Sequence, residues 1–470
     1  MRLQQAWPLF GLALMLCGVA AAADRSGDGE PAFRALYKEL VETNTTLSSG
    51  DCTLAAERMM ARLKAAGYRD ADLHLFVEPG HPKEGGLVAQ LTGSDASRKG
   101  ILLLAHLDVV EARREDWKRD PFTLIEEDGY FNARGAMDDK ALAAVFTDLL
   151  IRLKQEGYKP KRTIKLALTC GEETSEAFNG ANFLATQRKD WIDAAFAIGE
   201  GADGELDASG QPVIFGVEAA EKVYQDYLLE TVNPGGHSSQ PVPDNALYEM
   251  AVALQHVSTL EFPVELNDTT RAYFTRMADI VGGDRGAAMR ALVKDPTDAR
   301  ADAIVSADRK WHSMLRTTCV ATMINGGHAT NALPQHVAAN VNCRILPGVS
   351  IESVRDALVQ VIADPKVRVS IRDPRSPATP SPTLDPAVIK PIETVVAQLF
   401  PGVPVLPTMV TSANDGIFVT AVGIPTYGVS GMFVDPDFGN IHGLNERIRV
   451  KSLMDGRRFH YRVVKLWAGQ

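Results

Sequence analysis

The chain has 470 residues, more than one average domain, so two domains are expected. Hydrophobic residues make up 45% and charged residues 23%, which is typical of a folded globular protein. The net charge of −10 argues against a nucleic-acid partner, because no basic patch is available to bind phosphate.

Residues 1–23 predict a cleaved signal peptide. Arg2 supplies the positive start, Leu9–Val19 is an apolar stretch too short to span a bilayer, and Ala20–Ala23 offers a small-residue cleavage site. Two alternatives stay open: a lipoprotein processed at Cys17, and an uncleaved anchor. We expect export to the periplasm or beyond the cell, without a stable membrane anchor.

The first part of the chain alternates predicted helices and strands. We expect helices over Ala55–Gly67 and Lys140–Gln155, and strands over Leu87–Leu91, Ile101–Ala105, Thr163–Thr169 and Ala194–Ile198. This alternation predicts an α/β fold with a mostly parallel sheet covered by helices. Open sheets of this kind place their sites where strands end.

A second pattern begins near residue 222 and has the order β-α-β-β-α-β. Its predicted elements are Val223–Val232, Ala246–Val257, Thr317–Ile324, Ala338–Ile345, Ile351–Ile362 and Val367–Arg372. This order predicts a ferredoxin-like α+β unit over residues 222–378, with an extra helical segment near 261–315. The unit is inserted into a first domain made of residues 24–221 and 379–470.

Four cysteines remain after the predicted cleavage site. None of them forms a CxxC pair, and we assign none of them to a metal. Cys319 and Cys343 lie in two predicted strands that could be neighbours. A disulfide between them and two buried free thiols both stay open.

Five clusters of acidic residues and histidines carry the functional signal. They are His106-Leu107-Asp108, Asp138-Asp139-Lys140, Glu172-Glu173, Glu200 and His442. Each cluster alone has an ordinary structural explanation: a bonded His–Asp pair, a helix N-cap, an acidic turn or a lone structural histidine. Their order and their positions after apolar strands instead favour ligands for two metal ions that activate water.

These motifs resemble the dinuclear zinc aminoacylase and carboxypeptidase family of metallopeptidases. The resemblance covers nearly the whole mature chain, and the subgroup of carboxypeptidase S and secreted N-acyl-amino-acid hydrolases is the most similar in pattern. Supporting runs are Trp117–Phe122, Arg134–Lys140 and Asn342–Gly348. The departures from the family pattern are Gly171, Ala133 and Ala141, and none of them removes an expected ligand.

The resemblance implies a zinc-exopeptidase catalytic domain with an inserted lid, and it assigns roles to the clusters. It implies that His106, Asp138 and Glu200 hold one zinc ion, and that Asp138, Glu173 and His442 hold a second. Glu172 is the expected general base and then acid, and Asp108 orients His106. Cobalt or manganese could replace zinc at such carboxylate-rich sites.

The resemblance also implies substrate-contacting residues around the inserted unit. His237 is expected to polarise the scissile carbonyl across a homodimer interface, Asn331 to contact substrate, and Arg344 to pair with a free carboxylate. Gly431, on a predicted loop before His442, is expected to line the carboxylate pocket.

The expected function is hydrolysis of the amide bond before a C-terminal amino acid in a small peptide or an N-acyl amino acid. Glu200 favours this carboxypeptidase or deacylase function over the alternative, a dipeptidase or aminopeptidase of the same family. A relative that binds metal without catalysis is a further alternative, but Glu172 and every expected ligand are intact.

Overall fold

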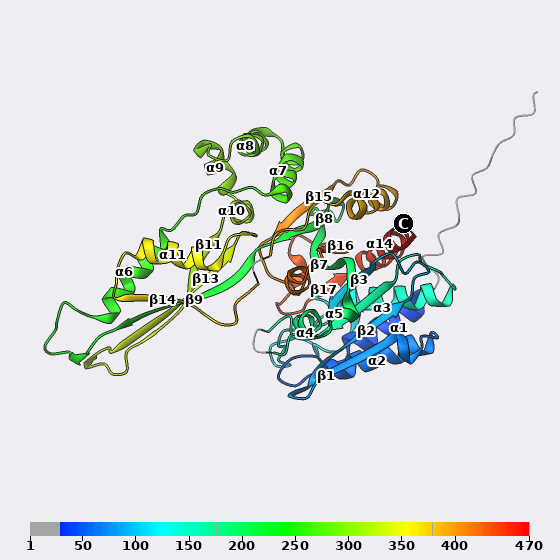
Figure 1. Cartoon of the computed structure of the whole chain (residues 1–470), viewed down its shortest axis with the longest axis horizontal. Coiled ribbons are helices and arrows are strands. Elements are labelled where there is room, and N and C mark those ends of the chain that lie inside the picture. Colours follow the sequence, from blue (N-terminus) through cyan, green and yellow to red (C-terminus); the bar gives the residue numbers. More distant parts are fainter. Residues whose placement is uncertain (1–28, 175–176, 378, 470) are drawn as a thin grey trace, which may run out of the picture.

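The structure, a computed structural model, describes residues 29–174, 177–377 and 379–469. Figure 1 shows a large α/β body beside a smaller unit, with a group of short helices above the junction between them. The predicted signal peptide lies outside the described residues and stays a prediction. Among the described residues, no helix is long and apolar enough to cross a membrane.

The large body is built on an eight-stranded sheet with the order β1-β2-β6-β3-β7-β16-β8-β15. Pairing is parallel between β6 and β3, β3 and β7, β7 and β16, and β8 and β15. The strands are β1 (Leu73–Glu78), β2 (His81–Leu91), β3 (Gly100–His106), β6 (Ile164–Thr169), β7 (Ala194–Leu206), β8 (Pro212–Glu221), β15 (Val405–Val410) and β16 (Thr426–Val434). A small sheet has the order β17-β5-β4, with β4 (Ile125–Glu127), β5 (Tyr130–Asn132) and β17 (Arg447–Arg449). The predicted mostly parallel α/β sheet is therefore confirmed.

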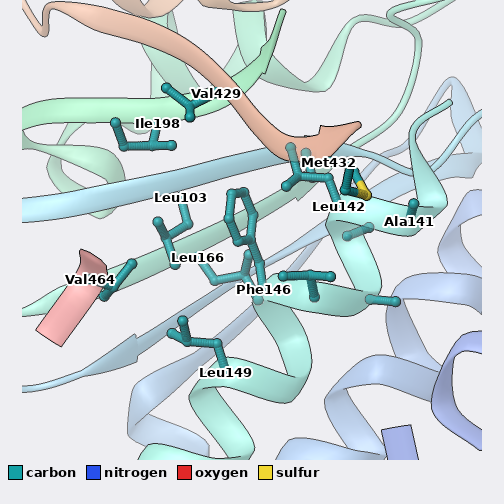
Figure 2. Close-up of a cluster of buried hydrophobic side chains, with 14 of the residues drawn as sticks. Leu103, Ala141, Leu142, Phe146, Leu149, Leu166, Ile198, Val429, Met432 and Val464 are labelled. Carbon is teal, nitrogen blue, oxygen red and sulfur yellow. The ribbon is translucent and has the colours of Figure 1, made fainter. Parts of the chain in front are cut away.

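Helices cover this sheet because its central strands are apolar on both faces. Every residue of β3 and β6 is buried, as expected for parallel strands between helical layers. In Figure 2, Phe146 of α3 lies among Leu103, Ile198 and Met432 of the sheet. The helices of this body are α1 (Glu30–Val41), α2 (Cys52–Ala65), α3 (Lys140–Gln155), α4 (Gly180–Gln187), α5 (Lys189–Ile192), α12 (Pro386–Leu399), α13 (Gly416–Ala421) and α14 (Val450–Gly469).

The smaller unit, called the lid here, is a four-stranded antiparallel sheet with the order β11-β13-β9-β14. This is the predicted ferredoxin-like order, with β9 first in the chain and β14 last. Its elements are β9 (Val223–Val232), α6 (Ala246–Ser258), β11 (Thr318–Gly326), β13 (His336–Ile345), α11 (Ile351–Ile362) and β14 (Val367–Ile371). A two-stranded ribbon of β10 (Gly236–His237) and β12 (Ala332–Leu333) extends from it. The exact domain boundaries stay a prediction.

The extra segment predicted near 261–315 is helical. It forms α7 (Asp268–Val281), α8 (Gly283–Lys294), α9 (Ala299–Ser306) and α10 (Arg309–Leu315). These helices share an apolar core with Ile214 of β8 and Met409 of β15, so they pack on the edge of the large sheet. Lys222, between β8 and β9, donates from Nζ to the carbonyl of Arg316 at 2.7 Å. The segment therefore packs on the large body and bonds to the residue where the chain enters the lid.

Two disulfides cross-link the described chain. Cys319 and Cys343 are register partners on β11 and β13 and are bonded, which decides the alternative left open by the sequence. Cys52, at the start of α2, is bonded to Cys170, just after β6. The sequence pattern did not predict this second pair, because the two cysteines are 118 residues apart.

Candidate active site

The carboxyl edge of the large sheet gathers the predicted metal ligands. His106 is the last residue of β3, and Glu173 follows the end of β6. Asp138 lies just before α3, and His442 lies in the segment that leads to β17. Parallel strands deliver their following residues to one edge, so ligands far apart in the sequence meet there.

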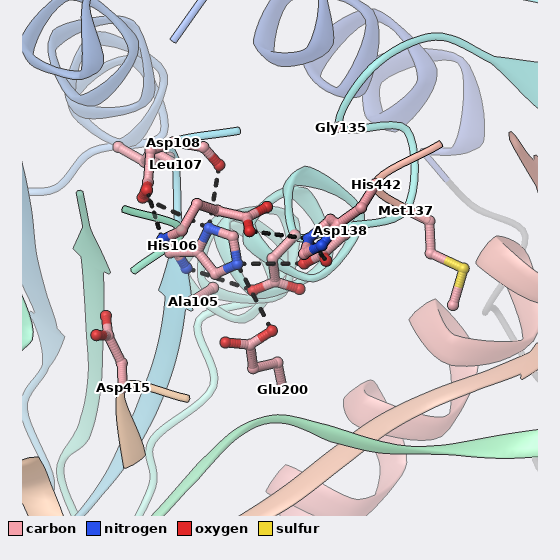
Figure 3. Close-up of polar contacts among 12 residues, drawn as sticks. Ala105, His106, Leu107, Asp108, Gly135, Met137, Asp138, Glu200, Asp415 and His442 are labelled. Carbon is pink, nitrogen blue, oxygen red and sulfur yellow. Dashed lines mark hydrogen bonds and ion pairs between the residues drawn. The ribbon is translucent and has the colours of Figure 1, made fainter. Parts of the chain in front are cut away.

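The first group consists of His106, Asp138 and Glu200, whose ligand atoms lie within 4.8 Å of one another. His106 Nε2 is 3.2 Å from Asp138 Oδ1 and 3.5 Å from Glu200 Oε2. Figure 3 shows these side chains converging on one point. The arrangement offers one imidazole nitrogen and two carboxylate oxygens, a donor set suited to zinc and similar divalent cations.

The second group consists of Asp138, Glu173 and His442. His442 Nε2 is 2.8 Å from Glu173 Oε2 and 3.1 Å from Asp138 Oδ2. Asp138 therefore turns one oxygen to each group, which is the geometry of a bridging carboxylate. The side chain of His442 is 53% exposed while that of His106 is 1% exposed, so the second group is the one open to solvent.

The charges in this cluster fit divalent cations. Glu200 Oε1 is buried and has no hydrogen-bond partner among the described residues, so it is free to bind a cation. Hydrogen bonds to Asp138 and Glu173 raise the pKa of His442 to about 10. Burial raises the pKa of Glu173, because a charged carboxylate is costly here without a cation.

Asp108 contacts both His106 and the segment that carries the paired glutamates. Its Oδ1 lies 3.5 Å from His106 Nδ1, while its backbone oxygen lies closer to that nitrogen, at 3.1 Å. Its Oδ2 accepts from the backbone N–H of Glu173 at 3.0 Å. The hydrogen bond of His106 Nδ1 is therefore to the carbonyl of Asp108, while Oδ1 has no hydrogen-bond partner among the described residues, and the orienting role of the carboxylate stays a prediction.

Glu172 lies half-buried beside these groups. Burial raises the pKa of Glu172 well above its usual value, and the negative charge of Glu200 raises it further. A carboxyl group of raised pKa next to candidate metal ligands suits a group that takes up and releases a proton.

One local expectation about the ligands was wrong. Glu200 is not at a strand end: β7 runs on to Leu206, and its pairing with β16 is irregular beside Glu200. Gly201, with φ of 142°, accommodates this irregularity in a conformation that favours glycine. The structural alternative for the Asp138–Asp139 pair, a helix N-cap, falls on Asp139, which leaves Asp138 to face the two histidines.

Two carboxylates that support the site were missed in the sequence. Glu446 is buried and accepts from Arg134 Nη1 at 2.7 Å and from the backbone N–H groups of Met137 and Asp138. It thereby holds the turn that presents Asp138. Asp415, labelled in Figure 3, accepts from Thr169 Oγ1 at 3.0 Å and from Asn179 Nδ2 at 2.7 Å.

His237 and Asn331 lie together on the ribbon that extends from the lid. The backbone carbonyl of Asn331 accepts from the backbone N–H of Ser238 at 3.0 Å. The Nδ1 atom of His237 forms a hydrogen bond with Ser239 Oγ at 2.8 Å. Both predicted substrate-contacting residues are exposed, so they are available to a ligand or to another chain.

Arg344 lies on the lid sheet and faces the junction with the large body. Its guanidinium stacks on the ring of Tyr224 at 4.6 Å, and its Nη1 donates to the carbonyl of Thr411 at 3.5 Å. Gly431 lies within β16 and not on a loop. A side chain at Gly431 would meet Phe459 of α14, so the structure gives this glycine a packing role.

A third group of potential ligand atoms contains Cys52, Asp108 and Cys170. Its two sulfur atoms are bonded to each other, so neither is a thiolate that could bind a metal.

A parallel sheet whose carboxyl edge gathers histidines and carboxylates, together with a ferredoxin-like lid, indicates a metal-dependent hydrolase. The model of Peptidase family M20/M25/M40 matches residues 102–466. The chain therefore belongs to this family, and it is a hydrolase that acts on peptide or amide bonds. This confirms the resemblance seen in the sequence.

Relatives and solved structures agree with this assignment. N-fatty-acyl-amino acid synthase/hydrolase PM20D1 of Mus musculus is 25% identical over 386 residues, covering 80% of this chain and 75% of that protein. Probable carboxypeptidase S-like 2 of Dictyostelium discoideum is 28% identical over 397 residues, covering 81% of this chain and 74% of that protein. The fold is similar to that of an M20 family metallo-carboxypeptidase, Sso-CP2, from Sulfolobus solfataricus. That comparison has a TM-score of 0.70 and 18% identity, and covers 93% of this chain and 99% of the other.

Proposed function

We propose that this hydrolase cleaves the amide bond before a C-terminal amino acid, as a carboxypeptidase or an N-acyl-amino-acid hydrolase with two zinc ions. The observation that carries the proposal is the sharing of Asp138 between two ligand groups. One group would be completed by His106 and Glu200, the other by Glu173 and His442. The names of the relatives, which include an N-fatty-acyl-amino acid hydrolase and a carboxypeptidase, support this substrate class.

In the proposed reaction, Glu172 handles the protons. Two bound zinc ions would supply Lewis acidity and lower the pKa of a water molecule in the site. Glu172 takes a proton from that water as the water attacks the amide carbonyl. Glu172 then gives the proton to the leaving nitrogen, so the amide and water become a carboxylate and an amine.

The residues around the lid would recognise the substrate. His237 would donate a hydrogen bond to the carbonyl oxygen as negative charge develops there. The guanidinium of Arg344 would pair with the free C-terminal carboxylate, and Tyr224 holds that guanidinium by stacking. Asn331, next to His237, would contact the substrate. Gly431 would support the carboxylate pocket indirectly, because it lets β16 pack closely against Phe459 of α14.

A substrate panel tests this proposal. Purified protein is assayed on N-acyl amino acids and dipeptides, each with a free or an amidated C-terminus, with and without added zinc. We expect metal-dependent release of the C-terminal amino acid that is abolished by amidation. Cleavage that is indifferent to amidation would remove the role given to Arg344 and favour an aminopeptidase. No turnover by metal-loaded protein would contradict the hydrolytic proposal.

We also propose that the protein is exported and acts as a homodimer through the lid. The apolar stretch Leu9–Val19 supports export, and the two disulfides suit an oxidising compartment. Edge strand β11 exposes Val320, Met323 and Ile324, which supports a contact between lids. Cell fractionation with N-terminal sequencing of the mature chain tests export, and light scattering tests the dimer. A full-length chain found in the cytoplasm would contradict export, and a monomer in light scattering would contradict the dimer.

A further inference from the structure

We infer that the connection between α1 and α2, residues 42–51, is a positioning element for the active site, and that the Cys52–Cys170 disulfide is its covalent anchor. The inference rests on the proposed roles of the ligand clusters. Residues 42–51 contain none of the candidate metal ligands or substrate-contacting residues.

This connection contacts the segment that carries His106 and Asp108. Thr45 Oγ1 donates to the carbonyl of Leu107 at 2.7 Å, and the N–H of Val109 bonds to the carbonyl of Thr45 at 3.4 Å. Thr45 is buried, so these bonds are shielded from water. The two bonds lie on either side of Asp108 and restrain its backbone.

The same connection contacts the start of α3, which follows Asp138. Lys140 is fully buried, and its Nζ donates to the carbonyl of Thr43 at 2.7 Å. A buried ammonium group needs such a partner, because leaving it unbonded is costly. The connection therefore also holds the helix start that presents Asp138 to both histidines.

The disulfide reaches the third ligand-bearing segment. Cys170 lies two residues before Glu172, and the Cys52 and Cys170 sulfurs lie within 4.8 Å of a carboxylate oxygen of Asp108. Asn179 Nδ2 also donates to the carbonyl of Gly171 at 3.0 Å. The Cys170–Glu173 segment is thus held by a covalent bond at Cys170 and by hydrogen bonds at Gly171 and Glu173.

The packing of α2 explains why this anchor is firm. Cys52 is the first residue of α2, and Asp51 caps that helix by accepting from the N–H of Leu54 at 2.8 Å. Met59 and Leu63 bury α2 in the main core. A segment joined to such a helix cannot move independently of the core, and small displacements of catalytic groups are costly for rate.

The second disulfide provides a matched control. Cys319–Cys343 joins the neighbouring lid strands β11 and β13, and neither cysteine belongs to a candidate ligand group. The test compares the Cys52→Ser/Cys170→Ser and Cys319→Ser/Cys343→Ser variants of the whole chain. The measurements are kcat and KM at saturating zinc, zinc affinity by chelator competition, and folding by circular dichroism.

We expect the Cys52/Cys170 variant to lose about 10- to 100-fold in kcat and in zinc affinity, with KM within about twofold of wild type. The control should keep both values. Equal kcat and zinc affinity in the two folded variants would overturn the inference. If the Cys52/Cys170 variant fails to fold, Thr45→Val decides: a lower kcat supports the inference, and an unchanged kcat overturns it. Zinc affinity is measured without substrate, so a failure of the proposed hydrolysis can be told apart from a failure of this inference.

Discussion

The candidate metal ligands and the candidate substrate-binding residues differ in how completely the fold assembles them. On the large sheet, ligand atoms of His106, Asp138 and Glu200 already lie within 4.8 Å of one another. On the lid ribbon, His237 is exposed and bonds to Ser239 of its own turn. The large body brings the candidate ligand atoms together by itself, whereas under the proposed function His237 would reach the substrate through a movement of the lid or from a second chain.

The largest effect is expected at the metal site itself. Glu172→Gln should lower kcat/KM by about 10³-fold, because the proton carrier is lost, while zinc content stays unchanged. Exposed Glu115→Gln is the control and should behave as wild type. Steady-state kinetics together with metal analysis check this prediction. A loss below tenfold would show that Glu172 does not carry the proton.

A smaller effect is expected for the exposed histidine of the lid. His237→Ala should lower kcat by about 10²-fold, as expected for loss of a hydrogen-bond donor to the developing oxyanion. Mixing this variant with Glu172→Gln should restore part of the activity if His237 acts across a dimer. No recovery in mixed dimers would place His237 in its own subunit's site, and an unchanged kcat would remove its role.

Arg344 tests recognition by the lid separately from catalysis. Arg344→Met should raise KM for substrates with a free carboxylate and lower kcat/KM by about 100-fold, the loss of one charge-assisted pair. Amidated substrates, which the wild type is not expected to cleave, should remain uncleaved by the variant. Arg372→Met is the matched control, because Arg372 bonds to Asn340 in the same sheet. Equal losses in the two variants would point to a structural role for both.

The smallest effect concerns stability and not chemistry. His460 of α14 is fully buried, and burial lowers its pKa from the usual 6.5 to about 4. As the pH falls, this histidine takes up a proton at a higher pH in the unfolded state than in the folded state. His460 therefore does not lower the free energy of unfolding above about pH 6.5, and it lowers it progressively as the pH falls toward 4. The loss at pH 4 is on the order of 3 kcal/mol. Urea unfolding of wild type and His460→Gln across this range checks it, and parallel curves would contradict it.

The sequence predicted most of the fold because those signals are local, and the resemblance to the metallopeptidase family supplied the grouping of the candidate ligands. Lys140–Gln155 and Ile351–Ile362 have helical periodicity and form helices over those same residues. The apolar runs that end near His106 and Glu173 are strands of the parallel sheet. Adjacent parallel strands bring such residues together without any further information.

The missed features depend on contacts between distant segments. Glu446 bonds to the backbone of Met137, 309 residues away, and Cys52 pairs with Cys170 across 118 residues. A residue pattern along the chain does not indicate which loop meets which helix. Glu200 was misplaced for a related reason, since the apolar run Ala194–Ile198 stops just before it and suggested a strand end where the strand continues through an irregularity.

Metal stoichiometry would show whether the Asp138 carboxylate serves two ion sites. Zinc bound per chain would be measured in wild type, Glu200→Gln, His442→Ala and Asp138→Asn after removal of loosely held metal. We expect two zinc ions per chain in wild type, one in Glu200→Gln and one in His442→Ala, and less than one in Asp138→Asn. A single ion in wild type, or two ions retained in Asp138→Asn, would contradict the shared role of Asp138.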